Sequence, residues 1–325
     1  MKPKRNGSAS PSQLEARVVS QLVNSALEED LGEPISLEAD ITAQWVIGDD
    51  DDRTMKGRIL SRQQGVVAGL DLAIGVFERL DPQARIQPSV ADGNYVSDEE
   101  TILELHGNAR SLVVAERTAL NFLQRLGGIA TITRHFVDAV QGTQARITDT
   151  RKTTPGLRRA ERHAVLCGGG VSHRFNLTDA VLIKENHVTA AGGAATAVQR
   201  AQHGAQTAGR PETLIMCETE TLDQVRELLS LGEPAWPDRI LLDNMSDEVM
   251  SQAVEIIRHE AGQQIAIEAT GGVELSSVRA IAGTGVDIVR PQTLVARQVV
   301  QIVGRPNEPR QAFEAFLGRA QRPLT

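Results

Sequence analysis

Apolar residues recur at helical spacing from position 14 to position 27, and an acidic run followed by Gly32 ends the predicted helix. Between positions 56 and 105 the pattern changes to short apolar runs bounded by turn residues, as in a small sheet. One helical stretch, residues 70–80, interrupts these runs. The runs cover residues 57–61, 65–69 and 101–105. The N-terminal part is therefore predicted to be an α+β domain.

From position 115 a long helix is predicted through position 126, after which short apolar runs alternate with amphipathic helical segments. The runs are residues 146–149, 180–184, 213–218, 239–243, 264–268 and 286–289. This alternation predicts a parallel sheet covered by helices. Most runs end in a charged side chain, namely Asp149, Lys184, Glu218, Asp243 and Glu268. A doubly wound sheet binds ligands only near its switch point, so charged ends on so many strands favour a barrel.

The composition excludes several classes of protein. The net charge of -8 and the 3% aromatic content argue against a nucleic-acid-binding surface. No apolar stretch is long enough to cross a bilayer, and the basic N-terminus lacks an apolar signal core, so neither a membrane partner nor a secretory signal is expected. Cys167 and Cys217 lie far apart without metal-ligand spacing, which predicts reduced cytoplasmic thiols and neither a disulfide nor a zinc site.

Cations gather in the segment from Asp149 to His187 of this acidic chain. Arg supplies bidentate donors for carboxylate or phosphate, and Lys supplies a compact charge, so the mixture suits a small, multiply charged anion. Arg151 and Lys152 alone would equally fit a solvated turn. Glycines 168–170 would let main-chain N–H groups approach an anion, or would form a flexible linker. Lys184 follows four apolar residues, which predicts an interior position with an anionic partner, or a lysine snorkelling from a strand edge.

Two carboxylates and one glycine pair extend this picture. In a barrel Glu218 and Asp243 would meet at one rim, where their oxygens suit Mg²⁺, although each could instead pair with an Arg or Lys. Residues 268–272 run from a strand into Gly271 and Gly272 before the next helix. This turn could hold a phosphate or be an ordinary connection.

These motifs, in this order, resemble the quinolinate phosphoribosyltransferase family, over the chain from about position 14 to its end. The matching segments are residues 116–126, 149–158, 167–174, 182–187, 241–245, 268–272 and 284–287. The resemblance implies an α/β fold in which an N-terminal α+β sandwich-like domain precedes an open seven-stranded α/β barrel. It divides the chain into a disordered tail (1–13), the N-terminal domain (14–127), the barrel (128–295) and a helical segment returning to the N-terminal domain (296–325).

The resemblance also implies a reaction. Phosphoribosyl would pass from phosphoribosyl diphosphate to quinolinate with decarboxylation, giving nicotinate mononucleotide, diphosphate and CO2, in NAD biosynthesis. Lys152, Glu218 and Asp243 would be catalytic, and Glu218 and Asp243 would hold Mg²⁺. A homodimer is expected, with Arg117 donated across the interface. The implied substrate-binding residues are Arg117, Thr150, Arg151, Lys152, His173, Arg174, Lys184, Thr270, Gly271 and Arg290.

Three positions depart from the family pattern. Met216 replaces a glutamate, Gly127 replaces a small residue such as serine, and Gln292 replaces the glycine that approaches the 5-phosphate. Arg290 either compensates by binding this phosphate or faces outward. The departures leave two alternatives: a paralogue that uses another pyridine carboxylate, and a silent anion-binding homologue.

Overall fold

The computed structural model describes residues 13–48, 54–291 and 294. The described residues form two compact units. Among the described residues, the N-terminal unit runs to Arg134 and also includes Thr154–Gly169, whereas the barrel unit contains His135–Thr153, residues 170–291 and residue 294. The predicted helical segment 296–325 and residues 1–12 of the predicted tail lie outside the described residues. Gln292 lies outside them as well.

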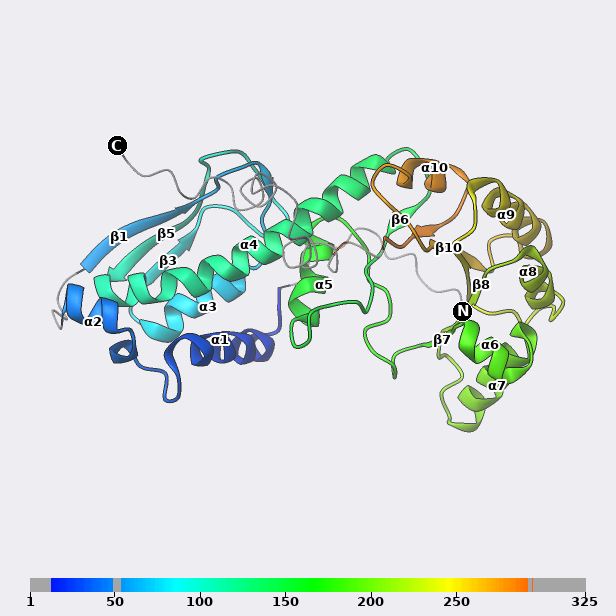
Figure 1. Ribbon diagram of the computed structural model, residues 1–325, viewed down its shortest axis with the longest axis horizontal. Helices are drawn as coiled ribbons and strands as arrows, with labels where there is room; N and C mark the ends of the chain where they lie inside the picture. Colours follow the sequence, from blue (N-terminus) through cyan, green and yellow to red (C-terminus); the bar gives the residue numbers. More distant parts are fainter. Residues whose placement is uncertain (1–12, 49–53, 292–293, 295–325) are drawn as a thin grey trace, which may run out of the picture. The chain divides into compact units, whose positions relative to one another are not determined.

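The N-terminal unit is built on an antiparallel sheet of order β1-β5-β3, formed by Thr54–Leu60, Thr101–Asn108 and Arg85–Pro88. A separate two-stranded sheet pairs β2 (Gly65–Val66) with β4 (Tyr95–Val96). Helix α1 (Ala16–Leu31) buries one side, including Val23 and Leu27, and packs on α3 (Leu70–Leu80) (Figure 1). The predicted α+β organisation of this part is confirmed.

Helix α4 (Ala109–Ala139) is longer at both ends than the predicted helix. It starts directly after β5, where the side chain of Asn108 accepts a hydrogen bond from the Ser111 amide at 3.1 Å. It also continues through the pair Gly127 and Gly128, because Ile129 and Ala130 beyond them are fully buried. The burial of the following turn therefore overrides the helix-breaking tendency of two glycines.

In the barrel unit all neighbouring strands are parallel, in the order β6-β11-β10-β9-β8-β7. The strands are β6 (Arg146–Ile147), β7 (Val181–Ile183), β8 (Ile215–Thr219), β9 (Arg239–Asp243), β10 (Ala266–Thr270) and β11 (Ile288–Val289). The first strand pairs with the last, which brings the sheet round on itself as a barrel requires. A parallel bridge between Thr148 and Val171 adds a seventh strand position beside β6. Within the described part of the chain, Val171 has no strand pairing with β7, so the barrel is open there.

The connecting helices follow one another around this sheet (Figure 1). They are α6 (Glu185–Ala191), α7 (Ala194–Thr207), α8 (Leu222–Leu229), α9 (Asp247–Ala261) and α10 (Val278–Gly283). Inside the sheet, Leu182, Met216 and Leu241 form a buried apolar cluster with Ala180. The α/β fold expected from the sequence is confirmed. None of the described helices combines the length and apolar character needed to cross a membrane.

Candidate active site

The strand register brings polar side chains together at the carboxyl ends of the barrel strands. Ile183 pairs with Cys217, so Lys184 follows β7 beside Glu218 on β8. On the neighbouring strands Thr270 lies directly opposite Asp243. Arg290 follows β11 and donates its amide to the carbonyl of Ala269 on β10. The sequence prediction that these strand ends meet at one rim is therefore confirmed.

Lys184 and Glu218 form an ion pair at this rim. The Lys184 Nζ lies 2.9 Å and 3.0 Å from the two carboxylate oxygens of Glu218. The predicted anionic partner of Lys184 is confirmed, but its predicted interior position is wrong, because its side chain is 48% exposed. A half-exposed ammonium keeps part of its hydration, so it can exchange Glu218 for a substrate anion at a modest cost.

The Arg290 guanidinium faces into the site. Its Nη2 donates to Thr270 Oγ1 at 2.9 Å and lies 3.3 Å from Glu218 Oε1. Its Nε lies 2.8 Å from Glu268 Oε1, without the directional geometry of a hydrogen bond. The alternative that Arg290 faces outward is therefore wrong.

Glu268 carries a fully buried carboxylate at the centre of this network. Its Oε2 accepts a hydrogen bond from Arg239 Nη1 at 2.6 Å and lies 3.4 Å from His173 Nε2. Burial opposes ionisation, but the His173 hydrogen bond and the charges of Arg290 and Arg239 outweigh it and lower the pKa of Glu268 to about 2. Glu268 is therefore a permanent anion at neutral pH.

His173 is held by both its backbone and its ring. Its amide donates to Asp149 Oδ1 at 2.8 Å, and its Nδ1 accepts from the Arg174 amide at 2.8 Å. Since Nδ1 is an acceptor, the neutral ring carries its proton on Nε2, the nitrogen that faces Glu268. Asp149 thus fixes the backbone position of His173, and the Arg174 amide fixes the tautomer of its ring.

Cations crowd the space around Arg174. The pKa of Arg174 is lowered by burial first, and then by the charges of Arg151 and Arg290. Arg174 also donates to the carbonyl of Ala180 at 2.9 Å, which fixes its guanidinium. In the preceding loop, Thr150 Oγ1 accepts from the Lys152 amide at 2.8 Å. The buried Nε of Arg151 has no hydrogen-bond partner among the described residues. This surplus of donors and positive charge suits a multiply charged anion.

Asp243 lies on the acidic side of the site. Burial, followed by the charge of Glu218, raises its pKa, while Arg290, Lys184 and Lys152 act in the opposite direction. A carboxylate whose pKa is raised by burial and by a neighbouring carboxylate belongs to a site that a divalent cation would stabilise. The carboxylate oxygens of Glu218 and Asp243 therefore fit Mg²⁺. Binding would require Glu218 to weaken its ion pairs with Lys184 and Arg290.

Comparisons with known proteins show the family of this chain. The family model of the quinolinate phosphoribosyl transferase C-terminal domain matches residues 129–301, and that of the N-terminal domain matches residues 40–127. The chain belongs to the quinolinate phosphoribosyltransferase family. A protein of Synechocystis sp. named probable nicotinate-nucleotide pyrophosphorylase [carboxylating] is 40% identical over 74% of this chain and 79% of its own length. A relative of the same name in Bacillus subtilis is 36% identical over 83% of this chain and 87% of its own.

Solved structures give the same result. The nicotinate-nucleotide pyrophosphorylase from Francisella tularensis has a TM-score of 0.78 at 35% identity, and the comparison covers 89% of this chain and 96% of that one. The chain thus shares both domains of the quinolinate phosphoribosyltransferase family and nearly the full length of a solved relative.

The departure from the quinolinate phosphoribosyltransferase pattern at Met216 has a structural explanation. Met216 is 3% exposed and packs against Leu182 and Leu241, one layer below Glu218 in the barrel interior. A thioether fills this apolar layer without needing a partner for a buried charge. Glu218 keeps its own contacts to Lys184 and Arg290, so the replacement leaves the rim intact.

The structure corrects the expectation that the glycine triplet presents main-chain N–H groups to an anion. The amides of Gly168 and Gly169 instead donate to Ala164 and Leu166, ending helix α5 (Arg158–Cys167). A Cβ on Gly168 would collide with the Ala130 carbonyl and with Thr133. These two glycines therefore allow α5 to end against α4.

Sequence reasoning missed three residues that shape the site: Arg239, Glu268 as an ion-pair partner, and Asn244. Alternate side chains of a β-strand lie on the same face of the sheet. Arg239, Leu241 and Asp243 are alternate residues of one strand, so the expected position of Asp243 in the barrel could have placed Arg239 on the interior face as well. Asn244 has a φ of 53° and donates its side-chain amide to Asp243 Oδ2 at 3.0 Å. The only signal in the sequence was an asparagine directly after the strand that ends at Asp243, since asparagine tolerates the left-handed conformation.

We expect Gly271→Ala to destabilise the fold by about 2–4 kcal/mol, because φ at Gly271 is +83° and a Cβ there would lie 2.7 Å from the Asn244 backbone nitrogen. Gly272 is the matched control, since its φ is +58° but a Cβ would meet nothing within 4 Å. Gly272→Ala should cost about 1 kcal/mol. Urea denaturation of both variants measures the difference, and equal losses would contradict the steric account.

Proposed function

We propose that the protein transfers phosphoribosyl from phosphoribosyl diphosphate to the ring nitrogen of quinolinate and releases diphosphate, CO2 and nicotinate mononucleotide. The observation that carries the proposal is the crowding of Arg151, Arg174 and Arg290, in which burial first, and then the charges of Arg151 and Arg290, lower the pKa of Arg174. Such a group of cations favours an anionic ligand, and a pyridine dicarboxylate carries two anionic groups. Membership of the quinolinate phosphoribosyltransferase family supplies the reaction class.

The cation cluster would bind quinolinate. Arg151 and Arg174 offer planar guanidinium groups that can each hold a carboxylate. The ring nitrogens of His173 face the Arg174 amide and Glu268, so His173 would support this site by holding these two residues in place. Lys184 would exchange Glu218 for a substrate carboxylate. Lys152, which is exposed in the loop after Thr150, would lie towards the diphosphate. Thr270 and Gly271 would hold the 5-phosphate, with Arg290 beside Thr270 as an additional cation.

Glu218 and Asp243 would hold Mg²⁺, which when bound neutralises the charge of the diphosphate as it leaves. The same two carboxylates would face the ribose. As the pyridine nitrogen forms its bond to the anomeric carbon, the bond from this carbon to diphosphate breaks and the sugar acquires oxocarbenium character. Fixed negative charge at Glu218 and Asp243 stabilises that developing cation.

Decarboxylation follows from the charge on the new N-glycosidic nitrogen. The carbon–carbon bond to the neighbouring carboxylate breaks, CO2 leaves, and the electron pair remains on the ring carbon next to the cationic nitrogen. A proton then replaces the carboxylate on that carbon. The chain's own part would be to hold both carboxylates through Arg151 and Arg174, with His173 keeping Arg174 in position, while this bond breaks.

The decisive test is turnover of carboxyl-labelled quinolinate with phosphoribosyl diphosphate and Mg²⁺, with nicotinate as a parallel substrate. We expect labelled CO2 and nicotinate mononucleotide to form in equal amounts, and no product from nicotinate alone. Turnover of nicotinate or another pyridine acid instead would assign the cluster to a paralogous reaction. Tight binding without turnover of any pyridine acid would identify a silent homologue.

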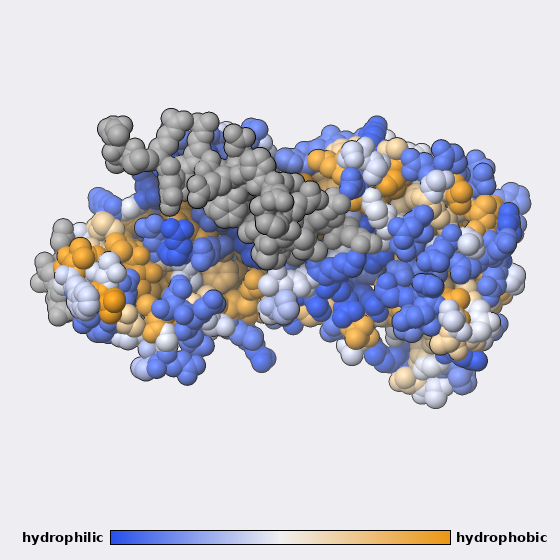
Figure 2. Space-filling model, in the orientation of Figure 1, coloured by the Kyte–Doolittle hydropathy of each residue, from blue (hydrophilic) through white to orange (hydrophobic). Residues whose placement is uncertain are grey.

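We further propose a homodimer in which Arg117 completes the partner's site. Arg117 is exposed on α4, as a side chain donated to another subunit must be. Ile41, Trp45 and Val46 on α2 (Ile41–Ile47) are 56%, 76% and 79% exposed, and apolar residues gather at this end of the N-terminal unit in Figure 2. Exposed apolar side chains of this kind support an interface with another copy of the chain.

Subunit mixing tests the donated arginine. Arg117→Ala and Lys184→Met should each be nearly inactive as homodimers. After unfolding and refolding together in equal amounts, about one quarter of the wild-type activity should return, because half the dimers are mixed and each has one intact site. Arg85→Ala, which changes an exposed arginine on β3, should keep full activity by itself. Recovery no greater than the sum of the two homodimers would contradict donation of Arg117.

A further inference from the structure

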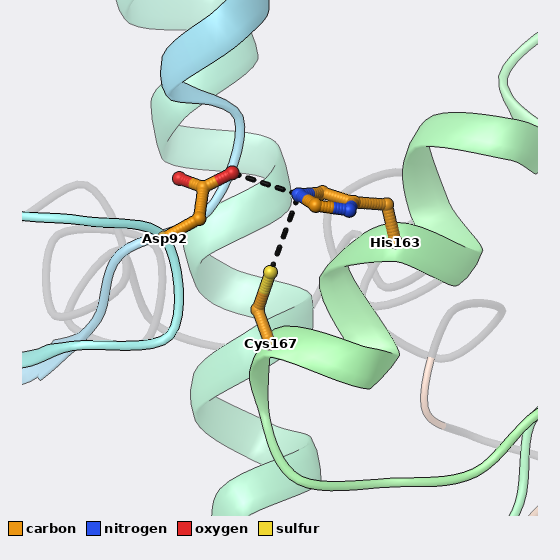
Figure 3. A group of neighbouring side chains, drawn as sticks. All are labelled: Asp92, His163 and Cys167. Carbon is orange, nitrogen blue, oxygen red and sulfur yellow. Dashed lines mark hydrogen bonds and ion pairs between the residues drawn. The ribbon is translucent and has the colours of Figure 1, made fainter. Parts of the chain in front are cut away.

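A second group of side chains with metal-ligand chemistry lies within the N-terminal unit, in the Asp92–His163–Cys167 cluster (Figure 3). His163 and Cys167 lie four residues apart on α5, so both face the same side of the helix. Asp92 approaches from the loop between β3 and β4. The three ligand atoms lie within 4.8 Å of one another, and His163 and Cys167 are buried.

The spacing of these atoms is close to that of a zinc site. His163 Nε2 lies 3.4 Å from Cys167 Sγ and 2.8 Å from Asp92 Oδ2. With Zn–S near ~2.3 Å and Zn–N or Zn–O near ~2.0–2.2 Å, ligand atoms around tetrahedral zinc stand roughly 3.3–3.6 Å apart. The sulfur–nitrogen separation already fits, and the oxygen–nitrogen separation needs an opening of about half an ångström.

Asp92 is oriented by a second layer of contacts. Its two carboxylate oxygens accept hydrogen bonds from the backbone amides of Gly69, at 3.0 Å, and Leu70, at 3.1 Å, at the start of α3. Backbone donors of this kind hold a ligating carboxylate in place. A metal bound here would therefore join α5 to the β3–β4 loop and the start of α3, all within one unit.

The arrangement does not fit a cysteine nucleophile. A Cys–His–Asp relay uses one ring nitrogen for the thiol and the other for the carboxylate, whereas here Nε2 faces both partners. Cys167 is also only 2% exposed, which leaves little access for a substrate. Three ligands converging on one enclosed point are the better description.

We propose that Asp92, His163 and Cys167 form a structural zinc site, with water or a further ligand as the fourth donor. Binding releases the thiol proton to solvent and forms the zinc–thiolate bond. The cysteine spacing in the sequence predicted no zinc site. That prediction considered only cysteine pairs, whereas this ligand set combines one cysteine with a histidine one helical turn before it and a distant aspartate.

Cobalt titration of the full-length, chelator-treated protein tests the site, with excess Mg²⁺ present to occupy carboxylate sites elsewhere. We expect a near-ultraviolet thiolate-to-cobalt band that saturates at about one equivalent and disappears when Zn²⁺ is added. Saturating Zn²⁺ should also raise the melting temperature by at least about 3 °C. A wild-type protein with no such band would overturn the proposal and leave a hydrogen-bonded cluster only.

Matched variants locate the sulfur ligand. Cys167→Ser and His163→Gln should each lose the cobalt band and the zinc-dependent rise in melting temperature. Cys217→Ser is the control, because Cys217 is equally buried but belongs to β8 in the barrel unit. A band that survives in Cys167→Ser, or vanishes in Cys217→Ser, would count against this site. Because the wild-type titration stands by itself, poor folding of one variant does not remove the test.

Discussion

Glu268→Gln is expected to destabilise the protein by about 3–5 kcal/mol at pH 7, because it removes a fully buried anion that compensates several cations. Arg239 and Arg290 would keep their positions in the barrel while the charge facing them is lost. His173 would keep a hydrogen-bond acceptor but lose the anion that lies 3.4 Å from its Nε2. Chemical denaturation of the variant and the wild type gives the free energy of unfolding directly.

Glu220→Gln is the matched control, since Glu220 is an exposed glutamate two residues beyond Glu218. It should change the free energy of unfolding by less than about 0.5 kcal/mol. The two variants make the same chemical change, so the difference between them measures burial and ion pairing. Equal stability of Glu268→Gln and Glu220→Gln would show that the cations do not depend on Glu268.

The same carboxylate gives a pH dependence with a definite sign. The pKa of Glu268 in the folded protein, about 2, lies below its ordinary value of 4.5. Its contribution to stability is therefore complete above pH ~5 and is lost as the pH falls towards 2. Between these limits the free energy of unfolding of the wild type should fall by about 3 kcal/mol more than that of Glu268→Gln.

Several parts of the fold could be predicted because they depend on local pattern. The apolar runs along the barrel strands and the helices around them follow from hydrophobic periodicity. The ends of α4 could not be predicted in this way. The helix continues through Gly127 and Gly128 because Ile129 and Ala130 beyond them are buried. The position of this helix end therefore depends on tertiary packing, which outweighs the low helix propensity of glycine.

The candidate site also contains residues that local pattern predicts and residues whose positions depend on tertiary contacts. Lys184, Glu218 and Asp243 were predictable, because charged residues at the ends of parallel strands converge wherever the sheet curls. The position of Arg290 was left open by the sequence, since its direction depends on Glu268 and Thr270 across the sheet. The prediction that glycine amides face an anion was wrong for Gly168 and Gly169, because these amides end α5, and the close approach of α5 to α4 is a tertiary contact that local pattern does not show.

Glu218→Gln is expected to lower kcat by on the order of 10²–10³-fold, with a smaller effect on the KM for quinolinate. Glu218 is the one described residue that joins Lys184, at 2.9 Å and 3.0 Å, to Arg290, at 3.3 Å. A neutral amide would weaken both ion pairs and would remove half of the fixed negative charge proposed to face the ribose. The loss should appear in kcat because the charge on the sugar develops only in the transition state.

Steady-state kinetics at saturating phosphoribosyl diphosphate and Mg²⁺ separates the two effects. Glu220→Gln again serves as the control and should retain wild-type kcat, since it changes the same functional group at an exposed position beyond the strand. The melting temperature of each variant shows whether a loss of rate reflects a loss of fold. If folded Glu218→Gln kept the wild-type kcat, the carboxylate would act only as a tether for Lys184, and stabilisation of the oxocarbenium-like sugar would rest on Asp243.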